Sequence, residues 1–382
     1  MIALSETVEE LKLWTRLRLA EAWRRSFDKT VFVGITGSHG KTTATAHLAE
    51  MLTTLGPTYV GIGRRKQTKR IAKGVLGASP RRCRYFVQEV SGHAPGALDD
   101  CIRVLQPTVG IVTAIGGDHR KSFSGERQAI AAEKAKLVHS LPAEGIAVLN
   151  ADDPLVAQMA DGCRCRVATF GQAEGADLQV VAANSNWPGR LTFEAVYRGQ
   201  HFDVATQLVG KHWTLSVSAA LLTALELGAR RSSCLDVIRN QKPIFNRMSV
   251  HPAPNGAWFF MDAQKASFQA VDACIDFVET ASAPRKTVIV GSLADYPGAA
   301  RPHYQKVARL ALDIADRVIF TGRNAQRVRR LTQQYPDRLL IVDEARDVKE
   351  MLSSDAIPGE LIYVKSSGAE MLHQLFVPPD QR

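Results

Sequence analysis

Residues 31–43 read Val31-Phe32-Val33-Gly34-Ile35-Thr36-Gly37-Ser38-His39-Gly40-Lys41-Thr42-Thr43. The β-favouring residues at the start predict a strand that ends at Thr36, and the run after Thr43 has helical spacing. Glycines between the two let backbone N–H groups face an anion, at which the N-terminus of the following helix also points. The stretch therefore predicts a phosphate-binding loop, made by Gly37, Ser38, His39, Gly40, Lys41, Thr42 and Thr43.

Lys41 and Thr42 have the two roles that such a loop requires. The lysine neutralises β- and γ-phosphate oxygens, and the hydroxyl beside it binds Mg²⁺. The loop departs from the usual phosphate-loop pattern at one position. A glycine is expected five residues before Gly40, but Ile35 stands there and Gly34 is one residue earlier. The loop alone predicts binding of a nucleoside triphosphate and no particular reaction.

Length and composition indicate a multidomain globular chain. The 382 residues suggest two or three domains, and 45% hydrophobic with 23% charged residues is ordinary for a soluble protein. No apolar run approaches the roughly 20 residues of a membrane span, and the first residues lack the order of a signal peptide. The six cysteines are scattered and predicted to be free thiols. We expect a cytoplasmic protein.

Much of the net charge of +10 comes from one segment. Residues 64–84 contain nine Lys or Arg and no acid. One interpretation is a solvated loop and strand edge, and the other is a surface that attracts an anionic substrate or partner. Nucleic acid is disfavoured, because no aromatic residue lies among these charges to stack on a base.

The order of expected elements predicts an α/β fold. A helix over 6–27 precedes alternating strands (31–36, 58–62, 85–90, 109–113, 147–150, 166–169) and helices (41–55, 95–105, 125–140, 153–160). A short antiparallel meander over 178–207 and helices over 212–227 and 233–240 follow. Strands at 258–262, 287–291, 317–321, 339–342 and 361–365 then alternate with helices.

Domain boundaries follow from this order. We expect an N-terminal amphipathic helix over 1–28, a central ATPase-type domain over 29–243 and a C-terminal domain over 244–382. The central domain should be a doubly wound, mostly parallel sheet that carries the phosphate loop and the small meander. The C-terminal domain should be a smaller, Rossmann-like α/β domain.

Polar residues end two further strands. Glu89 closes the expected strand 85–90, and Asp118 and His119 follow the strand 109–113. Carboxyl ends of parallel strands share one edge of a sheet, so these groups should converge on the phosphate loop. Glu89, His119 and Thr42 are therefore candidate Mg²⁺ ligands.

Several further motifs together resemble the Mur ligase family of ATP-dependent ligases. They are Thr36–Thr43, Glu89 before a serine, Thr113-Ala114-Ile115-Gly116-Gly117-Asp118-His119, the run Ile130–Leu137 before Leu141-Pro142, Val148–Asp153, Gly210-Lys211-His212, Asn246-Arg247-Met248, Asp262–Ser267 and Val364–Ser367. The C-terminal motifs look most like the branch that adds D-Ala-D-Ala. The resemblance covers roughly residues 30–375.

The resemblance implies an ATP-dependent ligation of a carboxylate to an amine, in which ATP first forms an acyl phosphate. It implies two Mg²⁺ ions and a carbamylated lysine, for which spacing favours Lys136 over Lys134. It places His212 and Arg247 with the nucleotide, and it has Asp262 and Lys265 complete the catalytic set with Lys41 and His119.

Departures from the family pattern concern the substrates. About 30 residues precede the phosphate loop, where the family has a UDP-sugar-binding domain, so we expect a small or carrier-bound carboxylate other than a UDP-muramoyl peptide. Trp213 and Ser216 stand where the family has asparagines for adenine, and Asp262–Phe268 lacks the branch's tyrosine and proline, which predicts an altered amine. Two alternatives are a degenerate nucleotide-binding partner, and a catalytic subunit that needs a second chain for recognition or ammonia supply.

Overall fold

The computed structural model describes residues 2–63, 67–117, 120–123, 125–264, 266, 268, 271–296, 298–368 and 371–377. The chain forms two compact units. The first comprises Met1–Ala183, Phe193–Ala205 and Thr214–Gln241, and the second comprises Asn184–Thr192, Thr206–Trp213 and Lys242–Arg382. The two segments 184–192 and 206–213 thus belong with the C-terminal part of the chain.

The first unit is built on one sheet in the order β2-β3-β1-β4-β5-β6-β7-β8-β9. Its strands are β1 (Val31–Thr36), β2 (Thr58–Gly61), β3 (Tyr85–Glu89), β4 (Val109–Val112), β5 (Ile146–Asn150), β6 (Arg166–Gly171), β7 (Leu178–Asn184), β8 (Thr192–Tyr197) and β9 (Gln200–Ala205). Strands β1 to β6 pair in parallel, with β1 between β3 and β4. The expected doubly wound sheet is confirmed, and β1 lies at its switch point, where ligands bind in such folds.

The expected meander extends this same sheet. Strand β7 pairs in parallel with β6, so the last three strands continue the sheet beyond its parallel part. Only Arg198 and Gly199 join β8 to β9, and a two-residue connection requires an antiparallel hairpin. Both turn residues have positive φ, of 51° and 72°, as the turns of tight hairpins require.

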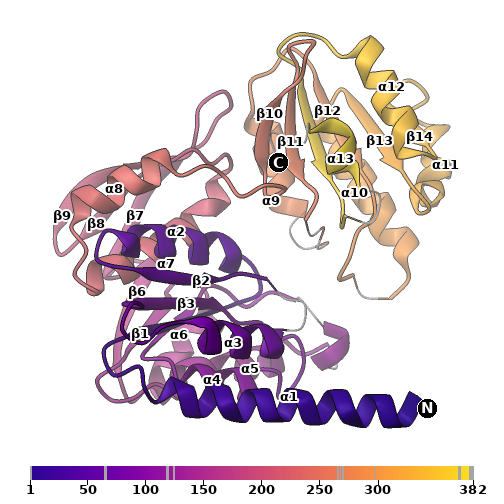
Figure 1. Ribbon diagram of the computed structural model, residues 1–382. Coiled ribbons are helices and arrows are strands. Elements are labelled where there is room, and N and C mark those ends of the chain that lie inside the picture. The colour runs from indigo at the N-terminus through magenta and orange to yellow at the C-terminus, as the bar shows by residue number, and fades with distance from the viewer. Residues whose placement is uncertain are drawn as a thin grey trace. The chain divides into compact units, whose positions relative to one another are not determined.

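Helices cover both faces of the first sheet (Figure 1). They are α1 (Ile2–Arg24), α2 (Lys41–Thr53), α3 (Gln67–Gly77), α4 (Asp99–Leu105), α5 (Arg127–His139), α6 (Pro154–Ala157), α7 (Thr214–Glu226) and α8 (Arg231–Asn240). Helices α2 and α7 pack together on one face, while α3 and α4 lie on the other and carry α1 on their outer side.

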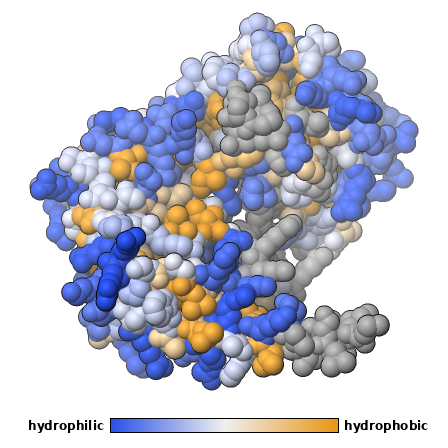
Figure 2. Space-filling view, viewed as in Figure 1, coloured by the Kyte–Doolittle hydropathy of each residue, from blue (hydrophilic) through white to orange (hydrophobic). Residues whose placement is uncertain are grey.

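Helix α1 buries one side and exposes apolar residues on the other. Leu17 and Ala20 join the core formed with α3 and α4, whereas Leu11, Trp14 and Leu19 are more than half exposed. In Figure 2, hydrophobic residues interrupt the hydrophilic surface on the side of the first unit where α1 lies. The helix is therefore attached to the ATPase-type unit, but it is less strictly amphipathic than the sequence predicts.

The interpretation of segment 64–84 as a loop and strand edge is wrong for Gln67–Gly77, which form α3, whereas residues 78–84 are a loop that leads into β3. Gln67, Ile71, Ala72 and Val75 are buried along one face of this helix. The cations project from the remaining surface, and Lys73 is exposed. The sequence did not predict this helix, because the many charged residues made the helical spacing of the few apolar residues difficult to recognise.

The second unit contains a six-stranded sheet in the order β10-β11-β15-β12-β13-β14. Its strands are β10 (Ser249–Pro252), β11 (Trp258–Asp262), β12 (Lys286–Val290), β13 (Arg317–Thr321), β14 (Leu339–Val342) and β15 (Leu361–Lys365). Its helices are α9 (Val271–Thr280), α10 (Ala300–Ile314), α11 (Arg329–Thr332), α12 (Ala345–Asp355) and α13 (Leu372–Phe376). The expected alternation is confirmed, but the antiparallel edge strand β10 was not predicted, because its four residues are too few to show a period.

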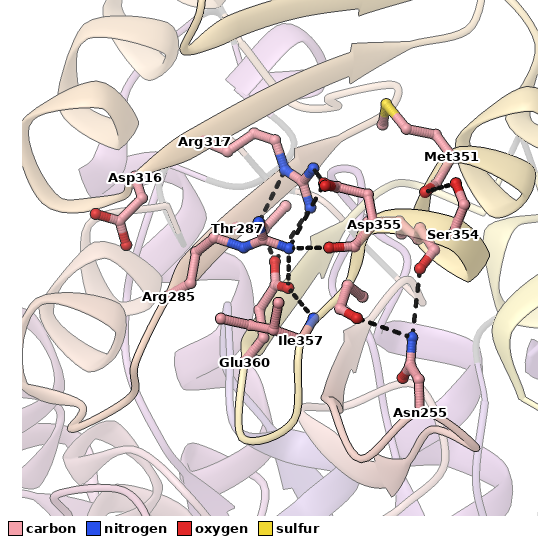
Figure 3. Close-up of polar contacts among 12 residues, drawn as sticks. Asn255, Arg285, Thr287, Asp316, Arg317, Met351, Ser354, Asp355, Ile357 and Glu360 are labelled. Carbon is pink, nitrogen blue, oxygen red and sulfur yellow. Dashed lines mark hydrogen bonds and ion pairs between the residues drawn. The ribbon is translucent and has the colours of Figure 1, made fainter.

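A buried ion-pair network ties the amino ends of three strands of this sheet together (Figure 3). Glu360, whose side chain is fully buried, lies 2.6 Å from Arg285 and 3.1 Å from Arg317. The hydroxyl of Thr287 donates to the same carboxylate at 2.5 Å. Asp355, at the end of α12, also pairs with both arginines. The network fixes β15 against β12 and β13 at the edge opposite their carboxyl ends.

Replacing Glu360 by Leu should destabilise the second unit by roughly 3–5 kcal/mol, because the two arginines then keep charge without their buried partner. Urea unfolding measures this difference. The control is Asp236→Ala, which removes an exposed pair with Arg239 and should cost at most about 1 kcal/mol. Equal effects of the two variants would contradict a structural role for Glu360.

Candidate active site

The phosphate loop connects the end of β1 to the start of α2, and two glycines shape it. Gly37 has φ 140° and Gly40 has φ 80°, which other residues rarely adopt. A Cβ on Gly37 would lie 2.0 Å from Thr113 Oγ1. The Thr113 hydroxyl in turn donates to the carbonyl of His39 at 2.6 Å, so the residue after β4 holds the loop against the sheet.

The lysine of the loop is buried and folds back over the loop. Lys41 Nζ donates to the carbonyl of Gly37 at 2.5 Å and lies 3.4 Å from that of Ser38. Ser38 Oγ is also buried and has no hydrogen-bond partner among the described residues. A hydroxyl of this kind beside an ammonium and a helix N-terminus fits an anion that accepts hydrogen bonds, such as a phosphate group.

Thr42 and Glu89 meet at the ends of adjacent elements. The Thr42 hydroxyl donates to Glu89 Oε2 at 3.0 Å, and the Gly63 N–H approaches the same oxygen at 3.3 Å. Glu89 is buried at the end of β3. A hydroxyl and a carboxylate in contact are oxygen ligands of the type that Mg²⁺ prefers, so the pair fits the predicted metal site. Asp118 and His119 lie outside the described residues, within which no three His, Cys, Asp or Glu side chains form a metal cluster.

The two candidate lysines of α5 lie in different surroundings. Lys134 is buried, and its ammonium lies 3.3 Å from the carbonyl of Gly92, three residues beyond Glu89. The Lys136 side chain is 39% exposed and pairs at 2.8 Å with both Asp99 and Glu133. The hydrogen bonds that the Lys136 ammonium donates to these two carboxylates raise its pKa. The structure thus brings Lys134, the second choice from spacing, to the segment that follows Glu89.

The residues at the expected adenine positions are both buried. Ser216, on α7, donates from its hydroxyl to the carbonyl of Gly40 at 3.1 Å, so it contacts the phosphate loop within the first unit. In the second unit, the rings of His212 and Trp213 lie 4.7 Å apart. The Trp213 Nε1 is buried and has no hydrogen-bond partner in the described part of the chain.

Arg247 stands between two residues with left-handed backbone. Asn246 has φ 61° and Met248 has φ 51°, conformations that are uncommon for residues other than glycine. Two hydrogen bonds hold this bend. The Gln264 N–H donates to the carbonyl of Asn246, and the Asn246 N–H donates to Ser249 Oγ. Such strain persists where surrounding contacts enforce it, often at functional sites. The strained backbone on both sides of Arg247 therefore supports a specific role for this arginine, as the sequence predicts.

Asp262 is the centre of a buried polar cluster at the carboxyl ends of β11 and β15. These strands place Asp262 and Lys365 opposite each other. Asp262 Oδ2 accepts from the Lys365 ammonium and from the Tyr363 hydroxyl at 2.8 Å, and Cys274 Sγ lies 3.6 Å away. The predicted companion of Asp262, Lys265, lies outside the described residues.

Charge pairing sets the ionisation of this cluster. Burial alone would raise the pKa of Asp262, but the Lys365 ammonium outweighs it and holds that pKa below its usual value, with a smaller contribution from His212. Burial would likewise lower the pKa of Lys365, yet Asp262 raises it to about 12. Asp262 is therefore a stable carboxylate and a weak base.

Sequence reasoning assigned no role to Thr113, Gln67, Tyr363 or Lys365. Thr113 and Lys365 could have been found, because each lies at the carboxyl end of an expected strand, where ligand groups gather. Gln67 accepts from the Ser91 N–H at 2.8 Å, and Tyr363 reaches Asp262 from within β15. These two contacts depend on tertiary packing, and no local pattern indicates them.

Comparison with known proteins places the chain in a family. The model of the Mur ligase middle domain matches residues 35–224, and that of the Mur ligase glutamate ligase domain matches residues 246–368. The chain belongs to the Mur ligase family. No helix among the described residues of this Mur ligase is long and apolar enough to cross a membrane.

Relatives and solved structures agree with this assignment. The Mur ligase chain is 26% identical to the UDP-N-acetylmuramoyl-tripeptide–D-alanyl-D-alanine ligase of Mycobacterium tuberculosis, over 88% of this chain and 70% of the relative. It is 30% identical to the UDP-N-acetylmuramate–L-alanine ligase of Dichelobacter nodosus over 61% of this chain and 46% of that protein. The fold resembles MurF of Thermotoga maritima in complex with ADP, with a TM-score of 0.81, 20% identity, and coverage of 95% of this chain and 82% of the other.

Substituting Gly37 by Ala should abolish or strongly weaken nucleotide binding by this Mur ligase. The new methyl group meets Thr113 Oγ1, and the backbone conformation is strained. We expect at least a tenfold loss of affinity for a fluorescent ATP analogue. Gly77→Ala is the control, since no atom lies within 4 Å of the position that its new methyl group would occupy. An unchanged affinity in Gly37→Ala would contradict the described loop geometry.

Replacing Lys365 by Met should reverse the pH dependence that Asp262 contributes to stability. In the wild type, the lowered pKa means that this contribution is present above the unfolded pKa, about 4, and is lost as pH falls through the folded pKa. Without the ammonium, burial raises the folded pKa, so the variant loses stability as pH rises through that value. Urea unfolding between pH 4 and 8 measures the difference from wild type.

The control for this experiment is Lys349→Met, which removes an exposed lysine of α12. Its stability difference from wild type should not change with pH. A pH-independent difference for Lys365→Met as well would show that Lys365 does not govern the ionisation of Asp262.

Proposed function

We propose that the chain is an ATP-dependent ligase that joins a carboxylate to an amine through an acyl phosphate, releasing ADP and phosphate. The observation that carries this proposal is the contact between Thr42 and Glu89 beside the buried ammonium of Lys41, at the carboxyl end of β1. Family membership supports the reaction class, and the relatives with curated names are amide-forming ligases.

The first step is phosphoryl transfer. An oxygen of the substrate carboxylate attacks the γ-phosphorus of ATP, the bond from that phosphorus to the bridging oxygen breaks, and ADP leaves. Charge builds on the transferred group, so Lys41 must exchange the carbonyls of Gly37 and Ser38 for phosphate oxygens. Mg²⁺, when held by Thr42 and Glu89, supplies further charge neutralisation.

The second step forms the amide. The nitrogen of the amine attacks the acyl carbon, phosphate leaves with the electron pair of the carbon–oxygen bond, and a proton leaves the nitrogen. Asp262 is too weak a base to remove this proton efficiently, because Lys365 keeps its pKa low. We therefore assign Asp262 to binding and orienting the incoming amine.

Lys134 is our candidate for the carbamylated lysine. Carbamylation joins CO₂ to a neutral amine with loss of a proton, and the product is an anion that can bind a second Mg²⁺. Lys136 suits this chemistry poorly, because Asp99 and Glu133 keep its amine protonated. Lys134 is buried and lies next to the segment that follows Glu89, which supports its choice.

We further propose that the substrates differ from those named for the relatives. Asp262–Phe268 lacks the tyrosine and proline of the D-Ala-D-Ala-adding branch, which supports an amine other than D-alanyl-D-alanine. The cations of segment 64–84 support an anionic carboxylate substrate.

ADP release over panels of carboxylates and amines tests the proposal, with Mg²⁺ and bicarbonate present. Release that depends on both partners, and that Lys41→Ala abolishes, is the expected result. ATP binding without stimulated release by any pair would instead favour a nucleotide-binding partner subunit.

Among the α5 lysines, Lys134→Ala should lower the rate of ADP release by about 100-fold or more, the range found when one charged or hydrogen-bonding group is removed from a transition-state site. Lys136→Ala is the matched control and should change the rate by only a few-fold. The same assay compares both, and a larger loss in Lys136→Ala would overturn the assignment of Lys134.

A further inference from the structure

A groove in the first unit lies between α1 and α3 and has a volume of about 530 Å³. Small-molecule sites in proteins fall in the range of roughly 300–1,000 Å³. Glu9, Glu10, Lys12 and Arg16 of α1 line it, together with Lys69 of α3 and His93. The groove is thus large enough for a ligand of a few residues and has charged walls.

The positive charges of the groove are available to a ligand. Lys12 pairs with Glu9 at 3.6 Å, but both side chains are about two-thirds exposed, so this pair is weak. No ion pair to Arg16 or Lys69 occurs within the described part of the chain. Lys12 and Arg16 of α1 and Lys69 of α3 therefore line the groove, while Glu9 and Glu10 lie nearer the N-terminus of α1 than Arg16 does.

Hydrogen bonds connect the wall of the groove to residues 91–92, which follow Glu89. Gln67, in the groove wall, accepts from the Ser91 N–H at 2.8 Å. His93 contacts the Ser91 carbonyl through Nδ1 at 3.2 Å, and the carbonyl of Gly92 lies 3.3 Å from Lys134. Because Ser91 is two residues beyond Glu89, a ligand in the groove lies beside the backbone that connects to the metal site.

We infer that this groove binds the carboxylate substrate and that this substrate is a short acidic peptide. Its side-chain carboxylates contact Arg16 and Lys69, and Glu9 and Glu10 attract its terminal ammonium. The inference rests on the proposed ligase function and names the substrate class of that site. A mixed-charge wall suits a peptide better than a polyphosphate, which the two glutamates repel, and the lining contains no Phe, Tyr or Trp to stack on a base.

The test measures binding of triglutamate to the full chain by calorimetry, with an ATP analogue and Mg²⁺ present. Lys69→Glu and Arg16→Glu should each weaken binding of triglutamate at least tenfold. The matched control is Arg82→Glu, which makes the same charge change at an exposed position of the same basic segment, outside the groove. It should alter binding less than twofold, and all three variants should bind the ATP analogue like wild type.

Two further ligands test whether the groove selects an acidic peptide. Trilysine should not bind, and UDP-N-acetylglucosamine should not displace triglutamate. Absence of triglutamate binding, equal effects of Lys69→Glu and Arg82→Glu, or displacement by the nucleotide sugar would each overturn the inference. ADP release with other carboxylates would still support the ligase function in those cases, whereas loss of all carboxylate-dependent ADP release would count against that function itself.

Discussion

The parallel pairing of β1 with β3 is the constraint on which the proposed reaction centre depends. It sets Ile35 opposite Glu89, so that strand β3 ends where the phosphate loop begins. The hydroxyl of Thr42, one residue into α2, then reaches the Glu89 carboxylate directly. On the other side, pairing with β4 brings Thr113 under the loop, where it holds His39. The pairing of these three short strands thus places Glu89 and Thr113 beside the phosphate loop.

The second unit uses similar residues for different purposes at the two edges of its sheet. At the amino edge, Glu360 is enclosed by Arg285 and Arg317 and serves to join three strands. At the carboxyl edge, Asp262 meets Lys365 and Tyr363. Ligands of such sheets bind at the carboxyl edge. Glu360, paired with cations at the amino edge, therefore has a structural role. Asp262, paired with a cation at the carboxyl edge, is a candidate for substrate contact.

The sequence predicted the fold well where strands are apolar and end in polar residues. Strands 31–36, 317–321 and 361–365 have the predicted bounds, because their β-favouring residues lie between clear turn signals. Helix α3 was missed because its charges concealed Ile71 and Val75. The choice between Lys134 and Lys136 could not be made from spacing, since both lie on one helix two residues apart. Glu133, three residues earlier on the same helix, is one acid beside Lys136, but the second, Asp99, comes from α4 and depends on tertiary packing.

Acyl-phosphate formation is the central claim, and trapping with hydroxylamine tests it most directly. Hydroxylamine replaces the amine and converts an acyl phosphate to a stable hydroxamate with release of phosphate. With ATP, Mg²⁺ and a panel of carboxylates that includes triglutamate, we expect hydroxamate and ADP in equal amounts, and neither product with Lys41→Ala. Release of ADP without hydroxamate for every carboxylate that stimulates it, or no stimulation by any, would contradict the account.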